Sequence, residues 1–431
     1  MELILNETRA RRVALAASLA LAGLVMAMAG RLWLADRWVD SRSIPSIQRG
    51  IHLEPGNADA WDRLGRAQQW DLENPDTTAA ILDFQKAVRY EPESPYYWID
   101  LGGAYEQSGD IAKARAAFEH ARAVYPISAQ VAWFYGNFLL RQQDSVAGME
   151  EIRRAVRSDP LILPLAISRV WHSGHDIDSV VQMLPPEPNA YFATLDFFAS
   201  AHDPDPALVV WQKLLALGKP LPLARSFPFL DDLIHQDRSA DARRVWLEAL
   251  AAASLPHDPP ADQSLIWNGS FAQPFAEGGL GWRWDSPVGT AIDFDTARVA
   301  GSGRSLRIDF GGGTNPELGS PSEYVPVEPG RVYNFRAYLH TDRISTESGM
   351  RFSIIDPNHP QAVNVVTENF TGTNPWKEVD AQVPAGPETH FLLVRLYRYP
   401  SRLFDNKLSG TVWMADLSLV PSSAPAEASK R

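Results

Sequence analysis

Apolar and polar residues follow three different patterns along the 431-residue chain. Residues 13–30, VALAASLALAGLVMAMAG, form an uncharged apolar run directly after a basic stretch, RARR. From about residue 36 to 253, apolar residues recur at helical spacing and the segments are separated by turns rich in proline and glycine. From 265 to 420, short segments such as RVYNFRAYLH and MRFSIIDP alternate apolar with polar residues, which is typical of half-buried β-strands. The patterns predict a multidomain chain with an apolar N-terminal helix, an all-α part and a C-terminal all-β part.

The apolar run predicts a transmembrane anchor over residues 13–34. A spanning helix needs about 20 mainly apolar residues, and no charge interrupts the run before Arg31. The basic tail 1–12 favours a cytoplasmic N-terminus, with the rest of the chain outside the cytoplasm, in the periplasm or at the cell surface. Two alternatives remain open: a cleaved signal peptide, with Ala27-Met28-Ala29 before a cleavage at Gly30, and a buried helix of a soluble protein.

One helical segment, residues 98–126, carries a specific motif. Trp98, Leu101, Gly102 and Tyr105 have the spacing W-x2-L-G-x2-Y, and looser copies precede and follow them. The copies end at Pro92, Pro126 and Pro160, which are separated by 34 residues each. This pattern resembles the tetratricopeptide repeat, best matched over residues 57–160. The remaining helical segments, 161–253, are expected to continue the array as degenerate hairpins.

The resemblance to tetratricopeptide repeats implies a solenoid over residues 36–253. Such a solenoid stacks helical hairpins, since one hairpin alone cannot bury its apolar face. Trp98, Tyr105 and Phe118 are expected to fill the space between neighbouring hairpins. The first helix of each hairpin would line a concave face that binds a protein partner. The residues expected to reach that face are Asp62, Gln69, Tyr96, Asp100 and Asn137.

The β part follows a linker-like segment, 254–264, and precedes a small, polar tail, 421–431, that is expected to be disordered. Six blocks within residues 265–420 come in the order of the family 4 and 9 carbohydrate-binding modules: LIWNGSFAQP, GWRW, GSGRSLRI, VEPGRVYNFRAYL, PWKEVDAQVP and SGTVWMADLSLV. The resemblance implies a jelly-roll sandwich that binds a glycan, often with a structural calcium. Ala272 replaces the acidic residue that usually follows NGSF, which leaves Asp416 as the matching metal ligand and makes calcium uncertain. Trp282, Trp376 and Trp413 match motif positions and are expected to be structural.

Several β segments place aliphatic residues on one side and Arg or Tyr on the other. Aromatic rings stack on the apolar faces of sugars, and Arg or Asn can bond their hydroxyl groups. We therefore expect the polar sides to form one glycan-binding face, with packing under loops or against the solenoid as the alternative. The candidate residues are Asn334, Arg336, Tyr338, Arg351, Arg395, Tyr397, Tyr399 and Trp284.

Composition excludes some classes of function. The net charge of −12 argues against a nucleic-acid partner, and the absence of cysteine excludes disulfides, thiolate catalysis and cysteine-bound zinc. Three patterns could suggest catalysis or metal binding: the pair Asp293 and Asp295, the cluster of His172, His175 and Asp176, and DFGGG at 309–313. We interpret them as a solvated strand, a hairpin turn and a chance match. No enzymatic activity, and no cofactor besides the calcium, is expected.

The sequence as a whole predicts a membrane-anchored extracytoplasmic scaffold or adaptor. The solenoid would bind a protein and the β domain a glycan, with exopolysaccharide or envelope assembly as the setting. One alternative is a pure protein-interaction scaffold whose β domain does not bind sugar. The other is a divergent glycan-active enzyme.

Overall fold

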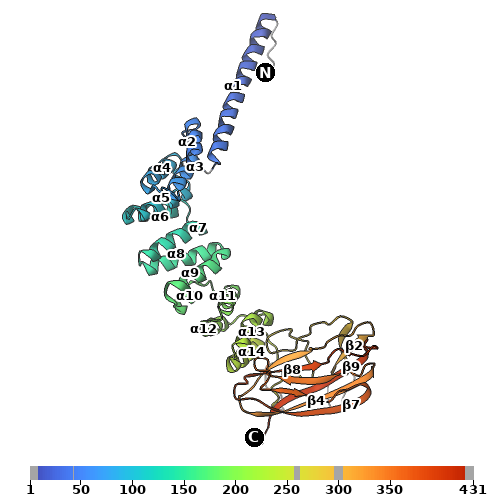
Figure 1. Ribbon diagram of the computed structural model, residues 1–431. Helices are drawn as coiled ribbons and strands as arrows, with labels where there is room; N and C mark the ends of the chain where they lie inside the picture. Colours follow the sequence, from blue (N-terminus) through green and yellow to red (C-terminus); the bar gives the residue numbers. More distant parts are fainter. Residues whose placement is uncertain (1–7, 42, 257–262, 296–303, 423–431) are drawn as a thin grey trace. The chain divides into compact units, whose positions relative to one another are not determined.

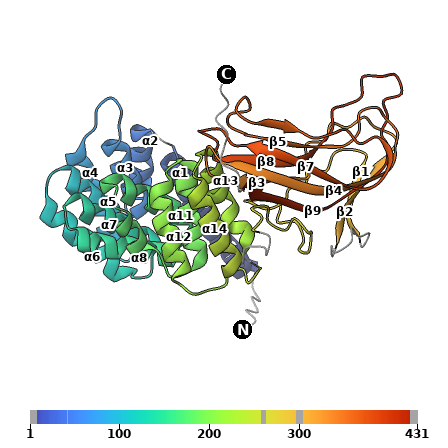
Figure 2. The same ribbon diagram turned by 90° about the horizontal axis from the view of Figure 1, so that it is seen from below.

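The computed structural model describes residues 8–41, 43–256, 263–295 and 304–422 (Figures 1 and 2). Within these ranges, fourteen α-helices are followed by nine strands. The predicted fold class is confirmed: an N-terminal apolar helix, a repeat-like helical solenoid and a C-terminal part of antiparallel sheets. Most of the predicted cytoplasmic tail and disordered tail, and the centre of the predicted linker, lie outside the described residues. The chain forms two compact units, Met1–Pro185 and Pro186–Arg431.

The first unit begins with the long helix α1 (Thr8–Val39). Its stretch Arg11–Val39 is long and apolar enough to cross a membrane, and none of its most apolar window is buried. The last turns, in contrast, pack on α2 (Ile44–Leu53): Ala35 and Val39 are buried, and Arg31 Nε donates to the Leu53 carbonyl at 2.8 Å. Carbonyl groups in the last turn of a helix lack partners within the helix, so Arg31 satisfies one of them. The helix therefore continues past the predicted end of the anchor and forms the first hairpin with α2.

Three helical hairpins follow in the segment with the repeat motif and stack side by side in both views (Figures 1 and 2). They consist of α3 (Ala58–Gln69) and α4 (Thr77–Tyr90), α5 (Pro95–Gln107) and α6 (Ile111–Val124), and α7 (Ala129–Arg141) and α8 (Ser145–Ser158). Gly102 explains how the two helices of the middle hairpin meet, because a Cβ there would lie 3.0 Å from the Phe118 ring. Trp98 and Tyr105 pack against the apolar clusters of adjacent hairpins, as predicted.

The later helices lack the motif but keep the hairpin arrangement. Helices α9 (Leu163–Gly174) and α10 (Ile177–Met183) complete the first unit. The second unit opens with α11 (Pro188–Ser200), α12 (Pro204–Leu215), α13 (Phe227–His235) and α14 (Ser239–Ala252). Their buried faces are built from large apolar side chains such as Phe198, Trp211 and Trp246.

The nine strands form two antiparallel sheets. The five-stranded sheet has the order β1 (Thr290–Asp295), β2 (Ser305–Gly311), β9 (Ser409–Pro421), β4 (Val332–Ile344) and β7 (Gly372–Pro384). The four-stranded sheet has the order β3 (Ser322–Pro326), β8 (Phe391–Tyr397), β5 (Arg351–Ile355) and β6 (Asn364–Val366). Phe335 and Phe352, one from each sheet, lie with ring centroids 5.2 Å apart. The apolar sides of the two sheets therefore face each other across one core.

The β part packs against the last helices of its own unit. The Trp246 ring of α14 meets the Trp267 ring edge-on at 5.4 Å, and Arg283 pairs with Asp231 of α13 at 2.6 Å. A Cβ on Gly279 would lie 2.9 Å from Trp246. The division between compact units thus falls at Pro185 rather than in the predicted linker 254–264.

The NGSF block has a packing explanation at β9. The pairing of β9 with β4 shifts register between Arg336 and Tyr338, and Asp416 in this bulge has a φ of 50°. The Leu417 N–H donates to the Gly269 carbonyl at 3.0 Å. A Cβ on Gly269 would lie only 2.0 Å from the Leu417 oxygen. The loop can therefore approach the bulge only if residue 269 has no side chain.

Replacing Gly269 by alanine is expected to lower the free energy of unfolding of the β part by about 1–3 kcal/mol, because the loop must move away from β9. Gly313→Ala is the matched control, since no atom lies within 4 Å of a Cβ there. Chemical denaturation monitored by tryptophan fluorescence measures both variants. Equal stability of the two would contradict the close approach of loop and bulge.

Candidate functional site

The inner helices of the repeats carry a row of ion pairs. Helices α3, α5 and α7, the first helices of three successive hairpins, lie next to one another. Arg66 of α3 binds Asp100 of α5 at 2.6 Å, and Arg141 of α7 binds Glu106 of α5 at 2.6 Å. The row presents charged groups of both signs on the side where the repeat resemblance places a bound protein segment.

Asp62 lies beneath this row and is almost completely buried, with 1% of its surface exposed. Its Oδ2 atom is 2.9 Å from Arg66, while its Oδ1 atom is buried without a hydrogen-bond partner. Burial, followed by the charge of Asp100, raises the pKa of Asp62 to about 8, although Arg66 opposes the shift. Burial also raises the pKa of Asp100. Burial beside Asp100 thus favours the neutral form of the Asp62 carboxyl.

Only some of the five predicted face residues are available for binding. Tyr96 is 42% exposed and Asp100 is half-buried. Gln69 and Asn137 are buried like Asp62: Gln69 donates to Gln107 at 2.7 Å and Asn137 to the Trp133 carbonyl at 2.8 Å. The Gln69 amide joins α3 to α5, whereas the Asn137 amide bonds within α7, and both residues are buried, so their predicted place on an open face is wrong. Arg66, Glu106 and Arg141 were not identified from the sequence as residues of this face. No local sequence pattern indicates which charged residue pairs with one in the next repeat.

The predicted glycan face is divided between the two sheets. Asn334, Arg336 and Tyr338 point outward from β4 of the five-stranded sheet, because their neighbours Phe335 and Ala337 are core residues. Arg351 and Arg395 lie on β5 and β8 of the four-stranded sheet. The two sets therefore occupy opposite outer sides of the sandwich. The prediction of one shared face is wrong, because β4 does not pair with β8 or β5.

The outer side of the five-stranded sheet carries a row of three aromatic rings. Trp413 of β9, His340 of β4 and Trp376 of β7 come from adjacent strands. The His340 ring stacks on Trp413 with centroids 4.7 Å apart and lies 5.5 Å from Trp376. All three are partly exposed, and the core neighbours of Trp413, Val412 and Met414, point the other way. Both tryptophans were expected to be structural; instead they face outward, and the alternation within TVWM was the signal that could have shown it.

Hydrogen bonds orient the rings of this aromatic row. Trp413 Nε1 donates to Asp295 at 3.0 Å, and His340 Nδ1 lies 2.5 Å from the Asn374 carbonyl. A carbonyl only accepts, so Nδ1 carries the proton and Nε2 is left as an acceptor. The Tyr338 hydroxyl donates to Glu378, and this bond raises the pKa of Tyr338. The row is therefore a preformed surface with flat apolar faces and polar edges.

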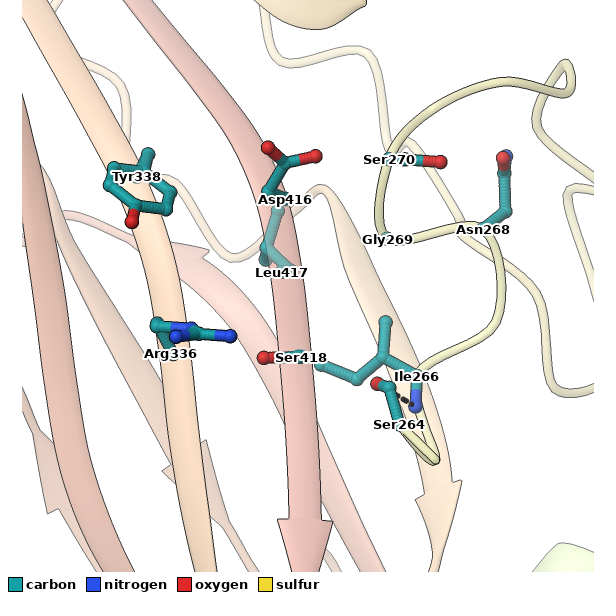
Figure 3. Close-up of a pocket in the computed structure, with 10 residues that line it drawn as sticks. All are labelled: Ser264, Ile266, Asn268, Gly269, Ser270, Arg336, Tyr338, Asp416, Leu417 and Ser418. Atoms are coloured by element: carbon teal, nitrogen blue, oxygen red, sulfur yellow. Dashed lines mark hydrogen bonds between the residues drawn. The ribbon is translucent and has the colours of Figure 1, made fainter. Parts of the chain in front are cut away.

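A polar pocket of about 360 Å³ continues this side of the sheet (Figure 3). Arg336 and Tyr338 of β4, with Asp416 and Ser418 of β9, lie on one side of it, and the loop 264–270 lies on the other. Both amide atoms of Asn268 are used within this loop, by Gln273 at 2.7 and 2.9 Å. Asp416 is the one carboxylate among the lining residues.

The surroundings of Asp416 match a calcium site poorly. Ca²⁺ prefers six to eight oxygen ligands, several of them from carboxylates. Among the described residues, no group of three or more His, Cys, Asp or Glu side chains could hold a metal ion. Calcium binding at Asp416 stays a prediction.

The four-stranded sheet brings the other candidates together. Arg395 lies 4.5 Å over the Tyr397 ring, and Tyr397 meets the Tyr399 ring edge-on at 4.6 Å. Tyr397 is only 7% exposed, and burial raises its pKa to about 12. Tyr399 is 55% exposed. Tyr399, rather than Tyr397, therefore offers a ring to a ligand.

Trp284 and the His172, His175 and Asp176 cluster lie apart from these groups, whereas Asp295 contacts the aromatic row. Trp284 packs partly against the sandwich core. Asp295 binds the indole of Trp413. His172 and His175 are exposed at the end of α9, and Asp176 caps α10 by accepting from Ser179 N–H at 3.2 Å, as expected for a hairpin turn.

Comparison with known proteins supports the helical repeats. The tetratricopeptide repeat family model matches residues 71–121 and 104–161. The N-terminal half of the chain therefore contains tetratricopeptide repeats, and the match does not reach the β part. No curated protein matches the chain.

Several solved structures are similar to part of the chain, at low identity and low TM-score. MamA is 16% identical, covering 41% of this chain and 86% of its own, with a TM-score of 0.26. YrrB, described as a repeat protein with an unusual peptide-binding site, is 14% identical, with coverages of 41% and 93% and a TM-score of 0.26. PilF of Pseudomonas aeruginosa is 14% identical, with coverages of 54% and 99% and a TM-score of 0.29.

Proposed function

We propose that this protein is a membrane-anchored scaffold that binds a protein segment through its repeats and a glycan through its β part. The observation that carries the glycan proposal is the aromatic row of Trp413, His340 and Trp376. It lies on the outer side of a sheet, and neighbouring bonds hold two of its three rings in place.

The geometry of the aromatic row suits a sugar chain. The ring centroids of neighbouring strands lie 4.7 and 5.5 Å apart, so a chain crossing the strands meets several rings in succession. The exposed parts of these rings would contact the apolar faces of sugars, while His340 Nε2 and the nearby Tyr338 and Arg336 provide polar groups for hydroxyls. Such an open site binds weakly, because sugar and protein stay largely wet. Anchoring many copies in one membrane would raise the effective affinity.

The membrane part of the proposal rests on α1. Its unpacked apolar portion ends near Arg31, where the side chain already binds the first solenoid hairpin. The repeats would therefore begin directly at the membrane surface. The basic residues before the apolar run favour a cytoplasmic N-terminus and a solenoid on the other side. Protease added to spheroplasts should then degrade the β part, and its full protection would contradict this orientation.

The protein-binding part rests on the tetratricopeptide repeats. Their exposed inner-face groups, Tyr96 and the ion pairs Arg66–Asp100 and Arg141–Glu106, would contact an extended or helical segment carrying charges of both signs. A pure protein-interaction scaffold is the second candidate function. The packing of α13 and α14 on the β part supports it, because helices of the same chain already cover part of this domain.

Replacing Trp413 by alanine is expected to weaken glycan binding about tenfold or more, since one stacking face is lost. The measurement is a titration of the full chain in nanodiscs with polysaccharides selected on a glycan array. Trp70→Ala is the matched control, because Trp70 is 69% exposed on the helical unit. Equal affinity of both variants would place the glycan elsewhere. If the protein binds none of the glycans, the pure protein-interaction scaffold remains as the candidate function.

A further inference from the structure

A second cavity lies at the loop end of the four-stranded sheet, on the other side of the sandwich from the aromatic row. Its volume is about 790 Å³, and Arg351, Tyr399 and Arg402 line it together with residues of the segments 347–348 and 400–401. The Arg351 guanidinium lies 6.0 Å over the Tyr399 ring.

A buried arginine holds the wall of this cavity in place. Arg398 is fully buried and donates to the Ser348 carbonyl at 2.8 Å and to Asn315 and Thr346 at 3.1 Å each. Ser348 Oγ in turn donates to the Tyr399 carbonyl at 2.6 Å. Three loops that are distant in sequence are thereby joined, so the cavity is preformed.

The arginines around the cavity lack the acidic partners that many other arginines of the chain have. Within the described ranges, no carboxylate oxygen lies within 4.0 Å of the guanidinium nitrogens of Arg351, Arg395 or Arg402, although the Glu347 carboxylate accepts from the Arg402 backbone N–H. The Nε atom of Arg351 is buried and has no hydrogen-bond acceptor. Arg351 also lines the cavity, where an anionic ligand would bond the terminal nitrogens of its guanidinium group.

Two acidic residues lie near these arginines. Glu347 lines the cavity, but the Ser401 hydroxyl donates to its two oxygens at 2.7 and 2.8 Å. Glu317 is exposed on the neighbouring loop, and its negative charge contributes to the raised pKa of Tyr397. With three arginines and two glutamates, this end of the sheet has a net positive charge, although the whole chain has a net charge of −12.

We propose that this cavity binds a sugar unit that carries a carboxylate, such as a uronic acid within an acidic polysaccharide. The carboxylate lies between Arg351 and Arg402, which suit it because guanidinium groups form paired bonds with carboxylates. The sugar ring lies on the exposed face of Tyr399. This inference rests on the proposed glycan binding of the β part but assigns a different site, on the opposite sheet, and a different ligand charge.

The test compares polygalacturonate with its carboxyl-reduced form, titrated into the full chain in nanodiscs. Arg402→Gln and Arg351→Gln are each expected to weaken polygalacturonate binding about tenfold at low salt and to leave neutral glycan binding unchanged. Arg343→Gln is the matched control, because Arg343 is 83% exposed and already pairs with Asp342. Arg402 is exposed, so its variant should fold even where the Arg351 variant does not.

The outcomes separate this site from the aromatic row. Polygalacturonate binding that survives Trp413→Ala but falls with Arg402→Gln supports the second site. If polygalacturonate and its carboxyl-reduced form bind equally well, this inference is wrong. The proposed function still holds in that case, provided that binding of a neutral glycan depends on Trp413. Failure to bind any polysaccharide overturns both. If polyglutamate competes as strongly as polygalacturonate and responds in the same way to Arg402→Gln, that result would overturn the glycan assignment and indicate an acidic protein segment as the ligand.

Discussion

Replacing Phe118 by alanine is expected to lower the free energy of unfolding of the helical repeats by about 3–5 kcal/mol, the usual cost of emptying a packed aromatic site. Phe118 is 2% exposed and lies against Gly102 within its own hairpin. Its ring also meets Phe138 of the next hairpin at 5.0 Å. Each repeat is stabilised largely by its neighbours, so the loss is expected to destabilise two hairpins together.

Phe134→Ala is the matched control for this prediction, because Phe134 is 43% exposed and belongs to the adjacent helix α7. Urea denaturation monitored by far-ultraviolet circular dichroism should show a lower midpoint for Phe118→Ala only. If Phe118→Ala keeps the wild-type midpoint but no longer binds a protein partner, the ring would have a binding role and the packing argument would fail.

The stability of the repeats is expected to fall by about 2–4 kcal/mol between pH 5 and pH 8.5 because of Asp62. The pKa of Asp62 is about 8 in the folded protein and near 3.8 when the carboxyl is exposed. The folded state therefore holds a proton that the unfolded state loses at a lower pH. The stabilisation is fully present below pH 4, and it is lost as the pH rises toward 8.

Asp62→Asn should remove most of this pH dependence, since the amide stays neutral at every pH. Asp59→Asn serves as the control, because Asp59 lies on the same helix with an exposed side chain. Urea denaturation at several pH values between 5 and 8.5 measures the effect. A wild-type stability that stays level over this range, or rises, would show that Asp62 is ionised in the folded protein.

Local pattern was enough to predict the repeats, because each depends on residues close in the chain. The spacing of Gly102 and Phe118 places a small residue opposite a large ring within one hairpin, and the structure has them in contact. Alternation likewise showed which side of β4 faces the core, since side chains of a strand point alternately to its two faces. Phe335 and Ala337 are buried as this pattern requires.

The candidate sites depended on contacts between distant residues and were predicted less well. Arg336 and Arg395 have the same local pattern, yet they lie on opposite sheets, because β4 pairs with β9 and β7 while β8 pairs with β3 and β5. Trp376 and Trp413 were expected to be structural from their motif positions, although Trp413 alternates with buried Val412 and Met414. The two tryptophans lie on either side of His340 because of the order of the strands. The alternation of apolar and polar residues does not specify that order.

The sequence by itself determined the apolar helix, the hairpin array and the inward and outward sides of each strand, because periodicity and small-residue spacing are local properties of a chain. Only the tertiary structure decided which outward sides meet. It placed the aromatic row on one sheet and the arginine-lined cavity on the other, and it used buried Arg398 to join loops more than 80 residues apart. Strand order and loop closure arise from long-range packing of one shared core, and no local pattern encodes them.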